Sequence, residues 1–177
     1  MPAAATPTLS QFAGRLLDTA HRQLLRSMDG LADDILYHLP SPHTNSIAWL
    51  AWHLSRWKDR YASILTGQPQ IWVSEGWAER FGMREEDTGQ GDTSEQVAAF
   101  RPNRDLLLGY VEAAHKGVMD RIENATPEQW LAPQPYGHNG ESRISWEAFV
   151  GTVMDFSQHA GQAAYVRGLL EGRGWRD

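Results

Sequence analysis

The chain has 177 residues, of which 41% are hydrophobic and 21% charged, and this composition is typical of one globular domain over residues 1–177. Its formal net charge of -6 argues against a surface that binds the phosphate backbone, so we expect no nucleic-acid partner. The chain has no cysteine, which excludes disulfides, thiolate metal ligands and a cysteine nucleophile.

Two long helices are predicted in the N-terminal third. Apolar residues at helical spacing predict a first helix over Leu9–Leu31, with Ser10 as its N-cap. Two prolines interrupt helical structure at 37–42. A second helix is then expected over Asn45–Leu65, before a glycine and a proline that end it.

A long connection should separate the second helix from the third. Residues 68–93 are rich in Gly, Glu and Gln, with one short helix expected near Trp77–Phe81. A connection of this length is uncommon unless it has a function, and it could form one wall of a pocket. It also lets the second and third helices run parallel. Helical signals resume at Asp92 and continue to Glu123, with Pro102 expected to kink or restart the helix.

The last long helix is predicted to begin at Ser145 as its cap and to run to Glu171, ending at the glycines of 172–174. A short helical turn at Thr126–Trp130 and a loop over Pro133–Arg143 precede it. No alternating pattern predicts a strand. Four long helices without strands indicate an all-α four-helix bundle. No apolar run is long enough to span a membrane and no secretory signal is visible, so we expect a cytoplasmic protein without a membrane partner.

Three residues on two of these helices form a candidate metal site. Asp155 and His159 are four apart and therefore share one helix face, and His53 lies on the second helix. Two imidazoles and a carboxylate suit Zn²⁺, Ni²⁺ or Fe²⁺ and leave coordination positions open for water or substrate. The alternative is a structural one. Both histidines point inward, and Asp155 could simply be a hydrogen-bond partner in a buried cluster without metal.

Several other side chains are candidates for supporting roles. Gln162 lies one turn beyond His159 and could orient a ligand or a metal-bound water. Arg56 and Arg167 could hold an anionic substrate, although ion pairing at the surface, for Arg56 with Asp59, is the alternative. His115 lies beside the apolar stripe of the third helix without an obvious partner, and we expect it to be a surface or boundary residue. Tryptophans crowd the helix of His53 and indicate core or interface packing rather than cofactor stacking: Trp49, Trp52 and Trp57.

The sequence Asn45-Ser-Ile-Ala-Trp-Leu-Ala-Trp-His53-Leu-Ser-Arg56 with Asp59, together with His159-Ala-Gly-Gln162 and Tyr165-Val-Arg-Gly-Leu-Leu170, resembles the DinB/YfiT-like superfamily. The resemblance implies a four-helix bundle of up-down-down-up topology, often a homodimer. It also implies a divalent metal, typically Zn²⁺ or Ni²⁺, held by three histidines. His53 and His159 match two of these ligands, and Asp155 stands where the third histidine is usual.

The same resemblance implies an activity. Relatives include S-transferases that use bacillithiol, mycothiol or glutathione, and a mycothiol-dependent maleylpyruvate isomerase. We therefore expect a metal-dependent thiol S-transferase or hydrolase that acts on a small-molecule substrate, with a low-molecular-weight thiol as cosubstrate. The alternative is a non-catalytic dimeric binding or stress-response protein with a degenerate metal site.

Overall fold

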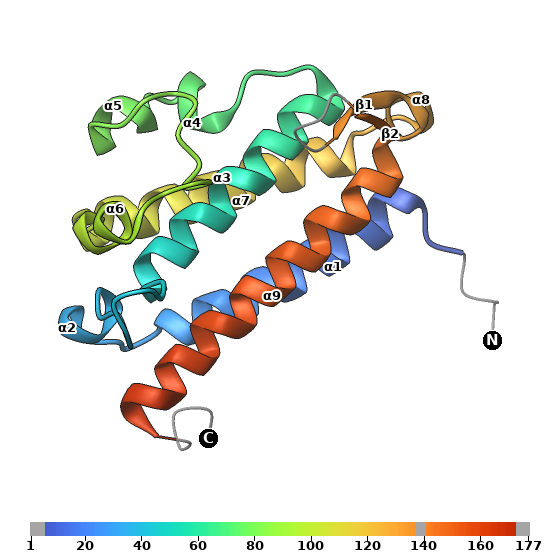
Figure 1. Ribbon diagram of the computed structural model, residues 1–177. Coiled ribbons are helices and arrows are strands. Elements are labelled where there is room, and N and C mark those ends of the chain that lie inside the picture. Colours follow the sequence, from blue (N-terminus) through green and yellow to red (C-terminus); the bar gives the residue numbers. More distant parts are fainter. Residues whose placement is uncertain (1–5, 137–140, 173–177) are drawn as a thin grey trace.

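The computed structural model describes residues 6–136 and 141–172 and is mostly helical (Figure 1). Four long helices dominate it: α1 (Leu9–Met28), α3 (Ile47–Thr66), α7 (Arg104–Glu123) and α9 (Ser145–Glu171). The short helices lie in the connections: α2 (Asp33–Leu36), α4 (Ile71–Ser74), α5 (Trp77–Phe81), α6 (Ser94–Ala99) and α8 (Pro127–Leu131). The predicted long helices and the predicted short helix at Trp77–Phe81 are thus all present.

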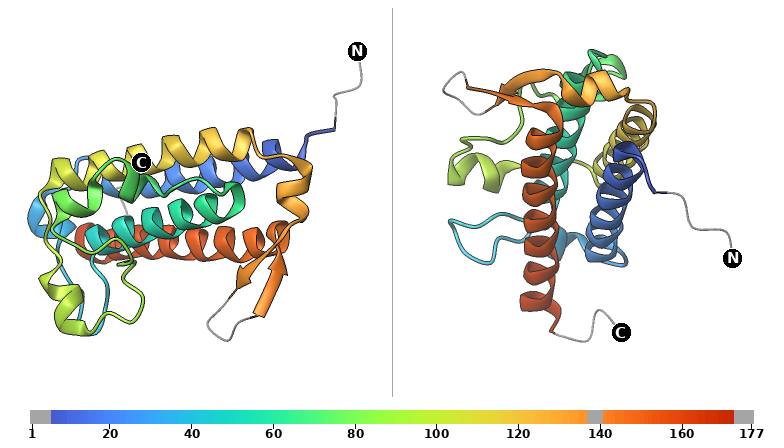
Figure 2. Two further views of the ribbon diagram at one scale, coloured as in Figure 1. Left: turned by 90° about the horizontal axis from the view of Figure 1, so that it is seen from above. Right: turned by 90° about the vertical axis from the view of Figure 1, so that its right-hand side faces the viewer.

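The long helices lie side by side and share one core (Figure 2). Helices α1 and α3 both pack against α7 on one side and α9 on the other. The larger apolar cluster surrounds Trp52 and Trp72, which are both fully buried. A second cluster, around Tyr61 and Phe149, fills the end of the molecule beside α8. This packing places α3 and α9, the two helices that carry the candidate metal ligands, against each other.

The helix ends differ from the predictions in ways that the capping contacts explain. Thr8, not Ser10, caps α1, because its side chain accepts from the amide of Gln11 while the Gln11 side chain accepts from the Thr8 amide. The helix ends at Met28 rather than Leu31, followed by Gly30 at φ 64°. Pro102 restarts the helix, as expected, because it separates α6 from α7.

A β-hairpin occupies the segment that was predicted to be a loop. Strand β1 (Pro133–Tyr136) pairs antiparallel with β2 (Glu141–Ile144), with Pro133 opposite Ile144 and Pro135 opposite Ser142. The prediction of no strand was therefore wrong. Two prolines concealed β1, because proline cannot donate to a ladder and is compatible only with a strand edge such as this two-stranded sheet offers.

Helix α9 begins directly after the hairpin. Ser145 is its first residue rather than its cap, and the Ser145 hydroxyl donates to the carbonyl of Ala132 at 2.9 Å. At the other end Gly172 is the C-cap, while the remaining residues of the predicted stop signal, 173–174, lie outside the described residues.

Throughout 6–136 and 141–172, no helix combines the length and the apolarity that a membrane span requires.

Candidate metal centre

The structure brings together the three predicted ligands from two helices. His53 comes from α3, and Asp155 and His159 come from successive turns of α9. Each offers a ligand atom, and these three atoms lie within 4.8 Å of one another. The imidazole centroids of His53 and His159 are 5.2 Å apart and their planes are nearly perpendicular. Nitrogen and carboxylate donors in this arrangement fit a divalent transition metal such as Zn²⁺ or Ni²⁺.

Contacts on two sides fix the orientation of His53. Its Nδ1 lies 2.5 Å from the carbonyl oxygen of Thr88, which can only accept, so Nδ1 carries the hydrogen and Nε2 keeps its lone pair for a ligand. Its ring stacks on Trp49 with centroids 4.5 Å apart. Burial lowers the pKa of His53, which favours the neutral imidazole that binds metal.

The other two ligands form a pair on α9. Nε2 of His159 lies 3.3 Å from Oδ1 of Asp155, and Nδ1 of His159 lies 2.7 Å from Oε1 of Gln162. The hydrogen bond between His159 and Asp155 raises the pKa of His159 and lowers the pKa of Asp155. The side chain of Asp155 is 45% exposed, so the site is open to solvent on the α9 side. Gln162 is thus placed to orient His159.

A tight turn in the connection covers His53. Gly89, next to Thr88, has φ 82°, a conformation that favours glycine. A Cβ at Gly89 would lie 2.7 Å from Trp49, 2.9 Å from Trp52 and 3.0 Å from Nδ1 of His53. Glycine at this position therefore allows the Thr88 carbonyl to approach the imidazole.

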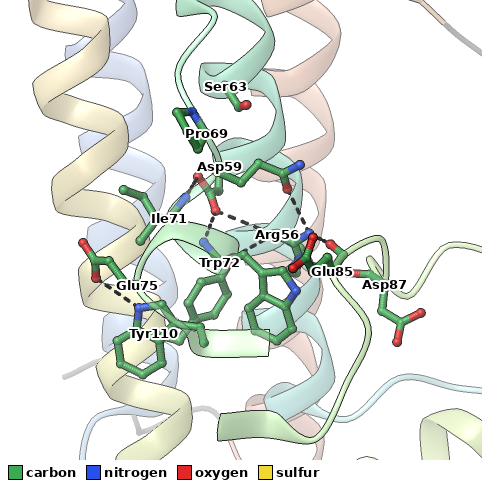
Figure 3. A network of polar contacts seen from close by, with 12 residues as sticks. Arg56, Asp59, Ser63, Pro69, Ile71, Trp72, Glu75, Glu85, Asp87 and Tyr110 are labelled. Carbon is green, nitrogen blue, oxygen red and sulfur yellow. Dashed lines mark hydrogen bonds and ion pairs between the residues drawn. The ribbon is translucent and has the colours of Figure 1, made fainter. Parts of the chain in front are cut away.

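Arg56 lies one helical turn after His53 on α3 and binds the segment just before Thr88 and Gly89 (Figure 3). It is 1% exposed. Its guanidinium donates to the carbonyls of Asp87 at 2.8 Å and Glu85 at 2.9 Å, and to the side chains of Gln70 and Tyr110. Arg56 does pair with Asp59, at 3.6 Å. The prediction of a surface location was wrong, because both side chains are buried. The donors of Arg56 are directed at protein groups rather than at the candidate site.

Asp59 anchors the start of the same connection. Its two carboxylate oxygens accept from the amides of Ile71 and Trp72, each at 2.9 Å (Figure 3). Arg121 of α7 approaches the same carboxylate at 3.4 Å and also donates to the carbonyl of Pro69. The predicted Arg56–Asp59 pair thus belongs to a buried network that fixes residues 69–88 against α3 and α7.

Comparison with known proteins places the chain in a family. The family model described as the DinB superfamily matches residues 16–163. The chain belongs to the DinB superfamily. No curated protein matches it. Among solved structures, it is similar to a conserved protein from Enterococcus faecalis, with 24% identity, a TM-score of 0.82 and coverage of 95% of this chain and 100% of that chain.

The predicted resemblance to DinB proteins is thereby confirmed, and the solved structure shows the shared fold.

In this DinB-superfamily chain two other predicted residues have structural partners. Arg167 donates to the carbonyls of Arg26 and Asp29 and pairs with Glu171, so it fastens α9 to the end of α1. His115 was expected to be a surface or boundary residue without an obvious partner. It lies at the boundary of the core, with its side chain 12% exposed, and its ring stacks on His21 at 3.7 Å.

The connection also forms a wall of a cavity of about 780 Å³, as its length suggested. The cavity lies between residues 81–92 and residues 96–102. Thr88 and Gly89 line it and also cover His53, whereas His53, Asp155 and His159 are not among the lining residues. The turn at 88–89 therefore separates the candidate metal centre from this cavity.

Sequence reasoning missed the Thr88 carbonyl and the role of Gly89. A backbone carbonyl has no residue signature, because every residue carries one. The available signal was the glycine content of the connection, since glycine in a long loop often marks a left-handed turn or a close approach.

Proposed function

We propose that this DinB-superfamily protein is a divalent-metal-dependent enzyme, a thiol S-transferase or a hydrolase, with Zn²⁺ or Ni²⁺ held by His53, Asp155 and His159. The observation that carries the proposal is the convergence of three ligand atoms within 4.8 Å, from helices about a hundred residues apart in sequence. Three protein ligands leave positions for water or substrate, which distinguishes catalytic sites from closed structural sites.

The surrounding residues prepare the ligands for an ion. The Thr88 carbonyl and the Trp49 ring hold His53 with Nε2 available, and Gln162 contacts the ring nitrogen of His159 opposite the one near Asp155. When bound, such a metal lowers the pKa of a water or thiol ligand and so supplies a nucleophile near neutral pH. The exposed side of Asp155 gives a small molecule access to the centre.

The choice between thiol and water is part of the proposal. A chain without cysteine cannot supply its own thiol, so a low-molecular-weight thiol would have to enter as cosubstrate. The test is to load the protein with Co²⁺ and follow its visible absorption spectrum while a small thiol is added. A new sulfur-to-metal band supports the S-transferase; an unchanged spectrum together with ester or amide hydrolysis supports the hydrolase.

The matched control for this test is a pair of histidine variants. His53→Ala should abolish the cobalt spectrum and any turnover. His43→Ala should change neither, because His43 is an exposed loop residue hydrogen-bonded to Ser94 and is not part of the candidate site. If both variants keep the spectrum of the wild type, the metal is bound elsewhere and the proposal fails.

One observation favours the second candidate, a non-catalytic binding or stress-response protein. Nε2 of His159 lies 3.3 Å from Asp155, with Gln162 on the other ring nitrogen, so these two side chains have partners without an ion. For this candidate, the protein should bind neither Zn²⁺ nor Ni²⁺ stoichiometrically, and His53→Ala should lower thermal stability rather than remove an activity.

The proposal includes the topology of the four long helices, which is that of an up-down-down-up four-helix bundle. It is supported by the long connection between α3 and α7, since both helices begin at the same end of the molecule in Figure 1.

A further inference from the structure

The cavity of about 780 Å³ beside the connection has the size of a small-molecule binding site. It lies next to α6, which Figure 2 shows outside the four long helices. Part of its lining is apolar and includes Phe81, Met83 and Phe100, which we call the apolar wall. Fully buried tryptophans support this wall from the core, because the ring of Phe81 packs on Trp72 and the ring of Phe100 packs on Trp52, with centroids 5.1 Å and 4.9 Å apart. The wall is therefore formed before any ligand binds.

The charged lining of the cavity divides into residues that pair with one another and residues that do not. Of the described residues, five charged side chains line the cavity. Arg84 pairs with Asp87 at 2.6 Å and with Glu86 at 3.3 Å. The other two, Asp92 and Arg101, have no ion-pair partner within 6–136 and 141–172. The cavity thus offers one carboxylate and one guanidinium to a ligand.

Both of these side chains are held by aromatic neighbours. Oδ2 of Asp92 accepts from Nε1 of Trp49 at 2.9 Å, whereas Oδ1 meets no donor in the described part of the chain. The guanidinium of Arg101 lies 6.0 Å from the ring of Tyr37, whose hydroxyl donates to the carbonyl of Pro102. An ammonium group is a suitable donor for a free carboxylate oxygen, and a carboxylate can accept two parallel hydrogen bonds from a guanidinium.

We propose that this cavity binds a zwitterion with an apolar side chain, which is the chemistry of a free amino acid or of a short peptide. Arg101 binds the carboxylate of this ligand and Asp92 binds its ammonium group. The apolar wall packs against its side chain. A molecule that carries only one of the two charges forms only one of the two charge-assisted contacts, so it binds more weakly.

The walls of the cavity also contact His53 on two sides. The carbonyl of Thr88, which lines the cavity, accepts the hydrogen of Nδ1 in the plane of the ring. Asp92 holds Trp49, and Trp49 stacks on the face of the same imidazole at 4.5 Å. A ligand bound to Asp92 therefore changes the surroundings of His53. Binding of the zwitterion needs no metal, so only the effect of this coupling on an activity rests on the proposed function.

The first test is calorimetric titration of the full chain with phenylalanine, glycylphenylalanine, phenethylamine and 3-phenylpropionate. At least one of the two zwitterions should bind, and about ten-fold or more tightly than the probe without a carboxylate and the probe without an ammonium group. The tighter zwitterion distinguishes a free amino acid from a peptide. Absence of binding by both zwitterions, or equal affinity for the singly charged probes, overturns the proposal.

A variant of the metal centre separates this site from the proposed function. An amino acid can chelate a metal ion, so binding at the candidate metal centre would imitate binding in the cavity. His53→Ala should keep the affinity for the zwitterion, because His53 does not line the cavity. Loss of binding in His53→Ala places the ligand on the metal and overturns the proposal, whereas a protein without metal that binds the zwitterion supports it.

Two substitutions assign the charges. Arg101→Gln should weaken zwitterion binding by about ten-fold and leave phenethylamine unchanged, and Asp92→Asn should weaken it similarly and leave 3-phenylpropionate unchanged. Asparagine can still accept from Trp49, so the fold is kept. The matched controls are Arg80→Gln and Asp120→Asn, which remove exposed charges outside the cavity and should leave the affinity at the wild-type value. Equal effects of cavity and control variants overturn the assignment.

Nuclear magnetic resonance tests the coupling without a metal. Saturation with the zwitterion should shift the indole N–H signal of Trp49 and the imidazole signals of His53. The imidazole signals of His21, which stacks on His115 between α1 and α7, should not move. Unchanged signals of Trp49 and His53 in the saturated protein would contradict the contact with Asp92.

Discussion

A comparison of Gly89 with Gly91 distinguishes the effect of close packing on stability from the effect of backbone conformation. Gly89 and Gly91 both have φ 82°, so alanine at either position costs about 1–2 kcal/mol of stability from backbone conformation alone. Only at Gly89 does the added Cβ also meet Trp49, Trp52 and His53. Crowding at this position is therefore expected to displace the Thr88 carbonyl from His53.

We predict that Gly89→Ala lowers stability by about 1 kcal/mol more than Gly91→Ala. We also predict that Gly89→Ala weakens metal binding whereas Gly91→Ala leaves it unchanged. Urea denaturation and Zn²⁺ titration by calorimetry measure the two effects. Equal losses of stability and of affinity in both variants would show that the turn does not hold the imidazole.

The candidate ligands and their proximity could be predicted from the sequence. Asp155 and His159 have helical spacing, and the inward phase of both histidines indicated that His53 could approach them. The contacts that orient them could not be predicted. The Thr88 carbonyl and the stacking of Trp49 on His53 depend on how a connection of more than twenty residues folds back, and local sequence patterns do not determine that path.

The connection between α3 and α7 depends on one buried guanidinium. Arg56 binds the carbonyls of Glu85 and Asp87, and the next residue, Thr88, orients His53. We predict that Arg56→Ala lowers stability by roughly 3–5 kcal/mol, because it leaves Asp59 buried beside fewer cationic partners. It should also expose residues 84–92 to proteolysis.

Arg60→Ala provides the control on the same helix. Arg60 is exposed and lies over the Trp57 ring at 5.5 Å, so its removal should change stability by no more than about 0.5 kcal/mol. Urea denaturation of both variants measures their stability, and limited proteolysis measures the exposure of residues 84–92. If Arg56→Ala and Arg60→Ala are equally stable and equally resistant, the network does not hold the connection.

The helices were predictable and the hairpin was not, for one physical reason. Long amphipathic helices repeat their signal over many turns, so α3, α7 and α9 could be recognised from apolar spacing. Each strand of the hairpin has only four residues, and β1 contains two prolines, so alternation could not be seen.

The core between α1, α3 and α7 contains a basic cluster that is separate from the candidate metal centre. His21 of α1 and Lys58 of α3 are buried, and His115 of α7 lies beside them at the boundary of the core. Both nitrogens of His21 and Nζ of Lys58 find no hydrogen-bond partner among the described residues. Stacked imidazoles cannot bond to each other, because their hydrogen bonds lie in the ring planes. Glu112 at 3.5 Å from His21, and Asp18 at 3.7 Å from His115, are the nearest carboxylates.

This cluster should make stability depend on pH. Burial lowers the pKa of Lys58 from 10.5 to about 7, that of His115 from 6.5 to about 4 and that of His21 from 6.5 to about 2. In each case the folded state resists protonation more than the unfolded state does. Stability is therefore fully present above the unfolded pKa and is lost as pH falls toward the folded pKa.

We predict that wild-type stability rises between pH 7 and pH 9.5, the window in which Lys58 is neutral only in the folded protein. Lys58→Met should remove most of this rise and should stabilise the protein at pH 7 by roughly 1–4 kcal/mol, since it replaces a buried amine by an apolar side chain of similar volume. Urea denaturation at both pH values measures this. An equal pH dependence in wild type and Lys58→Met would show that Lys58 is solvated.

The metal content of the protein, purified without chelator or nickel affinity resin, tests the proposed centre and is measured by plasma mass spectrometry. The wild type should hold close to one equivalent of Zn²⁺ or Ni²⁺ per chain. His53→Ala and Asp155→Ala should lose it while keeping the circular dichroism spectrum of the wild type. A wild type that is free of metal and cannot be reconstituted with Zn²⁺ or Ni²⁺ would contradict a metal centre at His53, Asp155 and His159.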